Sequence, residues 1–311
     1  MKTCSQPVIR TDNLTKRFGD LTAVDNLTFS VAPGELFGLV GSDGAGKTTT
    51  LRMLAGIMDP TTGDAWVLER HTVRETGAMA GDLGYMSQRF GLYPDLTVLE
   101  NLNFFADLHS LSRRERDRQA ERLLSFSNLA PFKKRLAGNL SGGMKQKLGL
   151  ACALIHTPKV LLLDEPTNGV DPVSRRDFWR ILYQLLAEGV TILIATAYLD
   201  EAERCHRVGL LQQGSLLACD TPEQLKKLMK GTILELRSPE LRRIARLLRE
   251  QLPGAQVGLF GDRLHIVTED VTLDTSRIEE IFKETSLPPP LLRPIEPSLE
   301  DIFVSIMTGK N

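Results

Sequence analysis

The sequence contains no apolar run long enough to cross a membrane. A spanning helix needs about 20 consecutive apolar residues, whereas the longest apolar stretches, residues 148–155 and 190–195, have the length of core segments. The first seven residues also lack the apolar stretch of a secretory signal. We therefore expect a chain that does not cross a membrane by itself and is not secreted.

The cysteines and the charges lack any pattern of paired or clustered use. Cys4, Cys152, Cys205 and Cys219 do not have the spacing of a disulfide framework or a zinc site, which favours a reducing, cytoplasmic location. Lys and Arg number 38 and Asp and Glu number 39, so the formal net charge is −1. Such a chain has no broad positive field with which to hold nucleic acid or an anionic bilayer. We expect no nucleic-acid partner.

The length and composition indicate an ordinary globular protein. At about 150 residues per domain, a chain of 311 residues predicts two domains. The 42% of hydrophobic residues and 25% of charged residues exclude the disordered and fibrous classes. A boundary near residues 230 and 231 divides the chain into a first domain, residues 1–230, and a second, residues 231–311.

The first domain has the pattern of an α/β protein. Apolar and polar residues alternate over the first 35 residues, which predicts antiparallel strands. Three continuous apolar runs are typical of strands buried on both faces of a parallel sheet, at residues 36–40, 160–163 and 191–194. Helices are expected at residues 48–57 and 173–187, and apolar residues at helical spacing predict a mostly helical insert at about residues 89–157.

The second domain has the pattern of a small α+β fold. Its elements are expected in the order strand, helix, strand, strand, helix, strand, which is the order of a ferredoxin-like fold. The strands are predicted at residues 233–236, 256–260, 264–267 and 291–293, and the helices at residues 241–252 and 276–284. We also expect Ser298 to cap a final helix.

The run Gly-Ser-Asp-Gly-Ala-Gly-Lys-Thr matches the phosphate-loop pattern G-x-x-x-x-G-K-[ST]. It stands after a buried strand and at the start of a helix, where the mechanism needs it. Glycines let backbone N–H groups turn inward around phosphate oxygens, Lys47 adds a positive charge, and Thr48 offers a hydroxyl to Mg²⁺. The expected nucleotide-binding residues are Gly41, Ser42, Asp43, Gly44, Ala45, Gly46, Lys47, Thr48 and Thr49.

Two carboxylates follow another buried strand. Asp164 and Glu165 come directly after residues 160–163, at the C-terminal end of a core strand, where open α/β sheets hold their ligands. Next to a phosphate loop, Asp164 is placed to support Mg²⁺ and Glu165 to polarise the attacking water. The two motifs together predict hydrolysis of a nucleotide.

A third motif heads the helix that follows residue 141. Ser141, Gly142 and Gly143 give this helix an N-terminus with small residues and exposed backbone donors, which suits an anion. With Leu-Ser-Gly-Gly-Met ahead of Leu-Leu-Leu-Asp-Glu-Pro-Thr-Asn-Gly-Val-Asp, residues 7–229 resemble the ATP-binding cassette (ABC) ATPases. The resemblance implies a RecA-like P-loop NTPase core with an antiparallel β-subdomain and a helical subdomain.

The resemblance also implies roles for single residues and partners. Two cassettes would dimerise head to tail, and each would hold Mg-ATP between its own phosphate loop and the partner's Ser141–Gly143 motif. Phe18 stands where an aromatic ring stacks on adenine, near Val24. Gln88 matches a catalytic glutamine that reaches Mg²⁺ and adjoins the membrane partner, and Asp171 belongs to a contact between cassettes.

The chain departs from the family pattern at two positions. Met144 replaces a glutamine that often ends the third motif, as in drug- and lipid-exporting bacterial cassettes. Ala197 stands where the family keeps a histidine that contacts the γ-phosphate and braces the catalytic glutamate, and a methyl group can do neither. Either a partner cassette with the histidine supplies most turnover, or Thr196 or Tyr198 supplies a hydroxyl in its place.

Three functional hypotheses follow. The leading one is the ATPase subunit of an ABC exporter, held at the inner face of the cell membrane by separate transmembrane permease subunits. The second is a cassette that binds ATP but hydrolyses it poorly beside a complete partner. The third, a soluble ABC protein of translation or DNA repair, is disfavoured because the sequence has no second cassette, long heptad pattern or zinc pattern. Residues 297–303 resemble the end of drug-exporter cassettes, whose extra C-terminal domain is accessory or regulatory.

Overall fold

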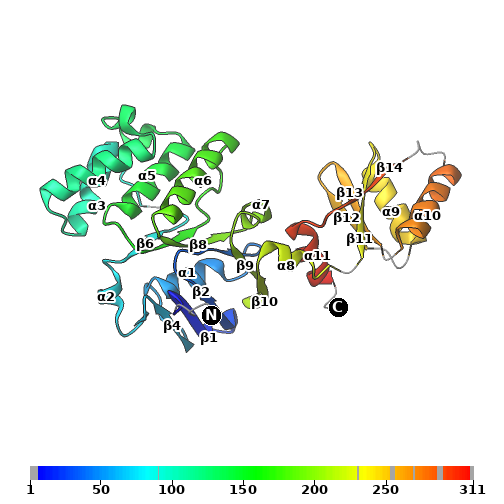
Figure 1. Ribbon diagram of the computed structural model, residues 1–311, viewed down its shortest axis with the longest axis horizontal. Coiled ribbons are helices and arrows are strands. Elements are labelled where there is room, and N and C mark those ends of the chain that lie inside the picture. Colours follow the sequence, from blue (N-terminus) through cyan, green and yellow to red (C-terminus); the bar gives the residue numbers. More distant parts are fainter. Residues whose placement is uncertain are drawn as a thin grey trace. The chain divides into compact units, whose positions relative to one another are not determined.

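The computed structural model describes residues 6–89, 91–229, 231–252, 256–268, 270–285 and 290–308. The chain divides into two compact units, Met1–Pro222 (unit 1) and Glu223–Asn311 (unit 2) (Figure 1). The assignment of domains to residues 1–230 and 231–311 stays a prediction, and Cys4 and Lys230 lie outside the described residues. Within the described ranges, no helix is both long enough and apolar enough to span a bilayer.

An antiparallel sheet begins unit 1, as the alternating pattern predicts. Its strands lie in the order β2-β1-β4-β5, with the bounds β1 (Ile9–Phe18), β2 (Leu21–Val31), β4 (Thr62–Val67) and β5 (Arg70–His71). The turn between β1 and β2 contains Gly19, whose φ of 57° suits glycine. Alternate side chains of β2, those of Leu27, Phe29 and Val31, are buried.

A larger sheet forms the centre of unit 1. Its strands lie in the order β10-β9-β3-β8-β7-β6, with the bounds β3 (Leu36–Val40), β6 (Leu83–Met86), β7 (Val160–Asp164), β8 (Thr191–Thr196), β9 (Arg207–Gln212) and β10 (Ser215–Asp220). β3, β7 and β8, which contain the three apolar runs, pair in parallel with their neighbours and are buried throughout. The residues that follow these strands therefore meet at one edge of the sheet.

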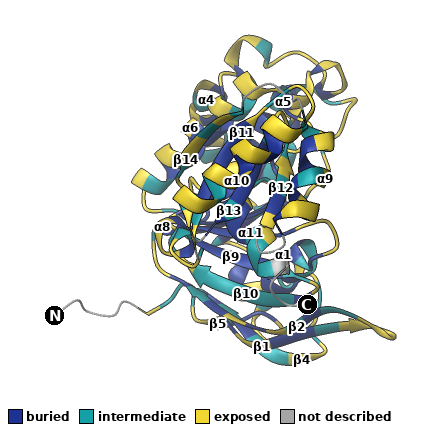
Figure 2. Ribbon diagram, turned by 90° about the vertical axis from the view of Figure 1, so that its right-hand side faces the viewer, coloured by how far each residue is buried: buried dark blue, intermediate teal, exposed yellow. Residues whose placement is uncertain are grey.

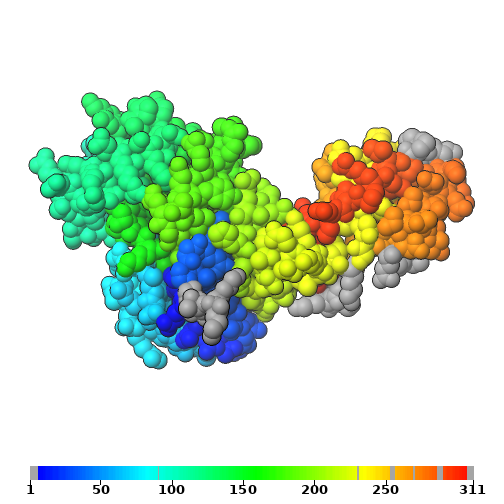
Figure 3. Space-filling model, viewed as in Figure 1, coloured from blue at the N-terminus to red at the C-terminus, as the bar shows by residue number. Residues whose placement is uncertain are grey.

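Helices complete unit 1. α1 (Lys47–Leu54) follows the loop after β3 and ends before Gly56, whose φ is 67°, so the predicted continuation to residue 57 is wrong. The helical insert contains α3, α4 and α5, and α6 follows β7; these helices form one lobe in the space-filling view, cyan to green (Figure 3). The remaining bounds are α2 (Thr76–Met79), α3 (Val98–Leu108), α4 (Arg113–Phe126), η1 (Ala130–Phe132), η2 (Ala137–Asn139), α5 (Gly142–Leu154), α6 (Pro172–Ala187) and α7 (Leu199–Ala202).

Unit 2 contains an antiparallel sheet in the order β12-β13-β11-β14, and its elements follow the ferredoxin-like order. The bounds are α8 (Pro222–Lys226), β11 (Thr232–Arg237), α9 (Leu241–Gln251), β12 (Gln256–Phe260), β13 (Arg263–Thr268), α10 (Val271–Glu284), β14 (Leu291–Ile295) and α11 (Leu299–Thr308). α9 and α10 bury their apolar sides against the sheet, and their outer sides are exposed (Figure 2). α10 begins earlier than predicted because Asp270 accepts the Leu273 N–H at 3.0 Å.

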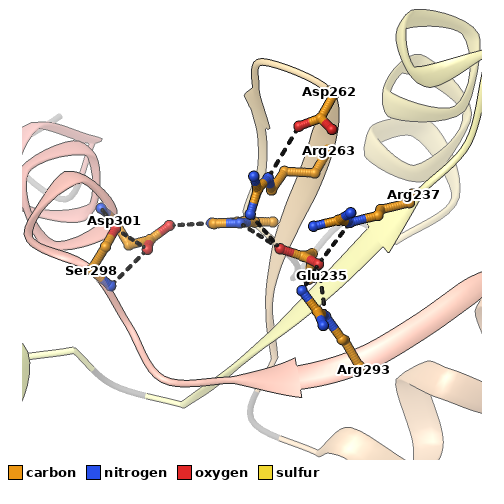
Figure 4. Close-up of polar contacts among 8 residues, drawn as sticks. Glu235, Arg237, Asp262, Arg263, Arg293, Ser298 and Asp301 are labelled. Carbon is orange, nitrogen blue, oxygen red and sulfur yellow. Dashed lines mark hydrogen bonds and ion pairs between the residues drawn. The ribbon is translucent and has the colours of Figure 1, made fainter. Parts of the chain in front are cut away.

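The sheet of unit 2 also carries a polar cluster, drawn in Figure 4. Glu235 of β11 lies between the core residues Leu234 and Leu236 and so points to the opposite face. It is only 2% exposed and forms ion pairs with three arginines, Arg237 at 3.1 Å, Arg263 at 2.9 Å and Arg293 at 2.6 Å. Burial alone would raise the pKa of Glu235, but hydrogen bonds from Arg293, Arg263 and Arg237 outweigh it and lower the pKa to about 2.

The last helix, α11, contacts the face of the sheet that carries Glu235, and its N-terminus is capped. His265 of β13 contacts Asp301 of α11, with 2.6 Å between Nδ1 and Oδ1. The Asp301 N–H donates to Ser298 Oγ at 3.3 Å, so Ser298 caps α11 as the sequence predicts.

Candidate functional site

The phosphate loop connects β3 to α1 and depends on glycine at two places. Gly46 has a φ of 101°, and a Cβ there would lie 2.4 Å from the Ala23 carbonyl oxygen. A Cβ on Gly41 would lie 2.2 Å from the Leu211 carbonyl oxygen. Neither position has room for a side chain, because neighbouring backbone encloses the loop. The chain thus forms a tight backbone cradle at the N-terminus of α1, the arrangement that binds phosphate groups.

Lys47 lies under this loop and is only 4% exposed. Its Nζ donates to the carbonyl oxygens of Gly41 at 2.8 Å and Ser42 at 3.1 Å. It also forms an ion pair with Glu165 Oε1 at 3.2 Å. A buried ammonium needs such partners, and they aim its charge at the space between the loop and the end of β7.

Glu165 follows β7 in a left-handed backbone conformation, with a φ of 47°. This conformation is uncommon for a residue with a side chain and is found at sites where the surroundings hold it in place. The Glu165 N–H donates to the Ala195 carbonyl oxygen of β8 at 2.8 Å. Its Oε2 accepts from Gln88 Nε2 at 3.0 Å and from Asn168 Nδ2 at 3.2 Å. Each carboxylate oxygen therefore has at least one donor.

Asp164, the last residue of β7, forms a pair with Thr48. The Thr48 hydroxyl donates to Asp164 Oδ1 at 2.9 Å. Oδ2 is buried and has no hydrogen-bond partner among the described residues. Burial raises the pKa of Asp164, a hydrogen bond from Thr48 lowers it, and the nearby Glu165 charge raises it further, so the net pKa lies above the ordinary value. A divalent cation would satisfy the unpartnered oxygen, so this hydroxyl and carboxylate fit Mg²⁺.

An open cleft of about 470 Å³ brings many of the predicted residues together. The cleft, which we call the phosphate-loop cleft, is lined by Phe18, Leu21, Ala23, Asp43, Gly44, Ala45, Gly46, Lys47, Thr48, Thr49, Gln88, Glu165 and Asn168. Phe18 is 46% exposed there, with Lys16 Nζ 5.3 Å from the centre of its ring, so the exposed part of the ring can contact a planar group. Phe18, Gln88 and the loop come from distant parts of the sequence, and the fold places them around one cavity. Asn168 is a member that the sequence analysis does not identify.

Other predicted residues lie away from this cleft. Val24 is fully buried in the core of unit 1 and does not line the cleft, although its side chain lies beside Gly46, which does. Ser141 caps α5 by accepting the Met144 N–H at 3.3 Å. Asp171 caps α6 by accepting the N–H groups of Val173 and Ser174. The roles of Val24, the Ser141–Gly143 motif and Asp171 in nucleotide binding stay predictions.

The hydroxyls of Thr196 and Tyr198, the two that could replace a histidine at position 197, have different partners. The Thr196 hydroxyl donates to Glu201 Oε2 at 2.8 Å, inside the fold. The Tyr198 hydroxyl donates to Asn168 Oδ1 at 3.3 Å, on the side of the cleft. Ala197 itself is exposed. Thr196 is therefore committed to a structural contact, whereas Tyr198 reaches a residue that contacts Glu165.

Comparisons with known sequences agree with this arrangement. A family model described as ABC transporter matches residues 24–168. Probable multidrug ABC transporter ATP-binding protein YbhF of Escherichia coli (strain K12) is 44% identical over 307 residues, covering 97% of this chain and 52% of that protein. The chain thus spans about half the length of this relative. Nod factor export ATP-binding protein I of Burkholderia thailandensis is 38% identical over 298 residues, covering 95% of each chain.

Solved structures share the fold of unit 1. An ATP-binding subunit of an ABC transporter is 28% identical, with a TM-score of 0.65, and the match covers 71% of this chain and 92% of that one. A dimeric ATP-binding cassette bound to ADP and phosphate in a post-hydrolysis state is 26% identical, with a TM-score of 0.63, covering 68% of this chain and 98% of that one. The three motifs, the fold and the length of the matches agree, and the chain belongs to the ABC transporter ATP-binding family.

Proposed function

We propose that this chain is the ATP-binding and ATP-hydrolysing subunit of a multi-subunit ABC exporter. One observation carries the proposal: a glycine cradle with a buried lysine and a glutamate on a core strand end face the same open cleft. Both relatives described above have names that refer to multidrug transport or to export. The substrate of transport would be recognised by another subunit, so this chain supplies the energy-coupling step.

In this proposal the phosphate-loop cleft binds Mg-ATP. The backbone N–H groups of the loop and the Lys47 ammonium hold the β- and γ-phosphates, and Phe18 packs on the adenine ring. Thr48 and Asp164 hold Mg²⁺, which neutralises charge on the phosphates when bound. Gln88 lines the same cleft and donates to the Glu165 carboxylate, and we assign it a contact with Mg²⁺.

Glu165 is the proposed general base. Its carboxylate accepts a proton from the attacking water as the new bond from the water oxygen to the γ-phosphorus forms and the bond to the β–γ bridging oxygen breaks. The products are ADP and inorganic phosphate. Gln88 and Asn168 donate to one carboxylate oxygen and Lys47 pairs with the other, so the group is held in one orientation.

The proposed partners are a second cassette and transmembrane permease subunits. Ser141 and Gly142 are exposed at the N-terminus of α5, away from this chain's own cleft, and so are free to complete the site of another copy. A relative of this fold is described as a dimeric cassette. We assign the second domain, residues 231–311, an accessory role in this assembly, and the permease would hold the complex at the inner face of the membrane.

Turnover of the purified chain tests the proposal. Mg-ATP should be hydrolysed, and Glu165→Gln should reduce kcat by about 100-fold or more while ATP still binds, because general-base catalysis contributes 10²- to 10⁴-fold. Sedimentation of the same variant with ATP should detect a trapped dimer. Glu188→Gln, a glutamate at the end of α6, is the matched control. ATP binding without any effect of Glu165→Gln on a measurable turnover would contradict the assignment of the base.

The second candidate function is an ATP-binding cassette with weak hydrolysis. Ala197 favours it, because the methyl group cannot contact a phosphate or brace Glu165. In that case the chain would bind ATP and dimerise with a different cassette, and the isolated chain would turn over far more slowly than the heterodimer. Steady-state ATPase rates of the chain alone and of the chain with its natural partner separate the two candidates.

A further inference from the structure

We propose that Tyr198 and Asn168 are positioning residues that hold Glu165 in its catalytic orientation. This inference rests on the proposed ATPase function and gives roles to two residues to which the motifs assign none. Tyr198 lies after β8 and Asn168 after β7, and together they connect the end of one core strand to the carboxylate at the end of the next. The reaction would therefore be supported by a side chain neighbouring Ala197.

The contacts form a directed chain of hydrogen bonds. The Tyr198 hydroxyl donates to Asn168 Oδ1 at 3.3 Å, and Asn168 Nδ2 donates to Glu165 Oε2 at 3.2 Å. An asparagine side chain has one acceptor end and one donor end, so a single orientation of the amide satisfies both contacts. Hydrogen bonds in such a chain polarise one another, which strengthens the donor that reaches the carboxylate.

Three contacts hold Tyr198 in place, one each at its backbone, its hydroxyl and its ring. Its backbone N–H donates to Thr196 Oγ1 at 3.0 Å, and its hydroxyl contacts Asn168. The guanidinium of Arg175, from α6, lies 4.5 Å from the centre of the Tyr198 ring. A tyrosine restrained in this way loses little further freedom when its hydroxyl forms a hydrogen bond, so the contact with Asn168 is favourable.

Arg175 is paired with a buried carboxylate of the segment after β8. Its Nε lies 3.7 Å from Glu201 Oε1, an ion-pair distance without a hydrogen bond, and Glu201 is fully buried. The Thr196 and Thr167 hydroxyls also donate to Glu201, which joins the segment after β8 to the segment after β7. The two segments that carry Tyr198 and Asn168 are thus tied together beneath the surface, and their side chains stay in register.

The sheet explains why this contact forms. β7 and β8 are parallel neighbours, and their register pairs Asp164 with Ala195. The residues that follow the two strands therefore emerge side by side. The Asn168 N–H also donates to the Glu165 carbonyl oxygen at 3.2 Å, which places Asn168 in the same turn as the carboxylate it supports. Gln88, the other amide on Oε2, comes from the segment after β6, so it reaches the carboxylate from a separate part of the chain.

Two variants each remove one of the two hydrogen bonds that connect Tyr198 to Glu165. Tyr198→Phe removes the hydroxyl and keeps the ring beside Arg175. Asn168→Asp keeps an acceptor for Tyr198 and replaces the donor to Glu165 by a negative charge. We expect kcat for ATP hydrolysis to fall about fivefold to tenfold in Tyr198→Phe, with a larger fall in Asn168→Asp. KM for ATP should stay within about twofold in Tyr198→Phe, because neither link contacts the phosphate cradle.

A double variant and a matched control complete the test. In Asn168→Ala, the further change Tyr198→Phe should have almost no effect, since both act through one contact. Tyr183→Phe, at a 44% exposed tyrosine of α6, should turn over like the wild type. Tryptophan fluorescence of Trp66 and Trp179 checks that unit 1 is folded in each variant.

The outcomes separate this inference from the function on which it rests. If the wild type hydrolyses ATP and Tyr198→Phe has the same kcat, the proposed ATPase function is unaffected and the inference is wrong. Equal losses of ATP affinity and kcat in Tyr198→Phe would also overturn it, because they indicate a general structural role. Absence of ATP binding by the wild type and by Tyr198→Phe would reject the proposed function and the inference together.

Discussion

Glu165 in unit 1 and Glu235 in unit 2 are both buried carboxylates on core strands or directly after them, and both pair with cations. Glu165 has one cationic partner, Lys47, and faces an open cleft beside an unpartnered oxygen of Asp164. Glu235 has three arginine partners whose guanidinium groups point at its carboxylate (Figure 4): Arg237, Arg263 and Arg293. Its pKa is lowered to about 2.

The difference distinguishes a binding cluster from a structural one. In unit 2 the three arginines satisfy the carboxylate of Glu235, so this ion-pair cluster acts through stability. His265 Nε2 is buried there without a hydrogen-bond partner among the described residues, but it lies 3.9 Å from Glu235 Oε2 and not in the phosphate-loop cleft. In unit 1 a buried oxygen of Asp164 lacks a hydrogen-bond partner within the described part of the chain until a ligand or cation enters the cleft. Burial of a carboxylate does not identify a site by itself. What identifies it is polar capacity that remains unused at a cavity.

The largest expected effect is the loss of ATP affinity in Lys47→Ala. Removing the ammonium deletes a charged contact to the phosphates and leaves Glu165 buried without its cation, so we expect binding to weaken by about 30- to 100-fold. Isothermal titration calorimetry measures it. Lys134→Ala removes an exposed lysine of the same unit and should leave affinity unchanged. Equal ATP affinities of the wild type and Lys47→Ala would mean that the Glu165 cluster is not a binding site and would end its contrast with the Glu235 cluster.

The next effect concerns unit 2. Glu235→Ala should destabilise it by about 3 kcal/mol, because the arginines lose their shared partner; we take the low end of the range since all three reach solvent. Hydrogen exchange of peptides from β11 and β13 reports this unit, whereas both tryptophans lie in unit 1. Glu240→Ala, which removes a surface pair with Arg243, should cost less than about 1 kcal/mol. ATP affinity should not change in Glu235→Ala, and a marked loss would contradict the structural reading.

The same carboxylate predicts a pH dependence. The pKa of Glu235 falls from an ordinary 4.5 to about 2 on folding. A lowered folded-state pKa gives stability that is complete above the unfolded value and is lost as pH falls through the folded value. Unit 2 of the wild type should therefore lose this contribution between about pH 4.5 and pH 2. In Glu235→Gln the protection of β11 amides, relative to their intrinsic exchange rates, should depend less on pH over this interval. An identical pH profile of this protection in wild type and variant would refute the assignment.

The smallest effect is expected at Ala197. If Tyr198 and Asn168 already hold Glu165, Ala197→His should change kcat by less than about twofold. If instead the chain is a weakly hydrolysing cassette, the same change should raise kcat clearly and more than it changes KM. Ala197→Ser, which adds only a small hydroxyl, is the control for the added volume. A large gain with histidine alone would favour the asymmetric dimer.

Most of the fold is predictable where the sequence pattern is long or chemically distinctive. Continuous apolar runs identify β3, β7 and β8, and alternation identifies the antiparallel strands of β1 and β2. The signal is weaker for β6 and β9, which each contain a glycine, and for β10, which lies at one edge of the sheet; tertiary pairing stabilises all three. The start of α10 is missed because a single cap at Asp270 extends it.

The phosphate loop, Asp164 and Glu165 are determined by local sequence, since their chemistry needs a fixed spacing after a buried strand. Gly46 and Gly41 belong there because backbone at fixed positions leaves no room for a Cβ. Asn168 meets Glu165 within one local turn. The meeting of Tyr198 with Asn168 is different, because it follows from the parallel register of β7 and β8, which joins residues about thirty positions apart and which no local pattern records. Sequence alone thus determined the groups that face the phosphates, and only the tertiary structure decided which side chains hold the base in place.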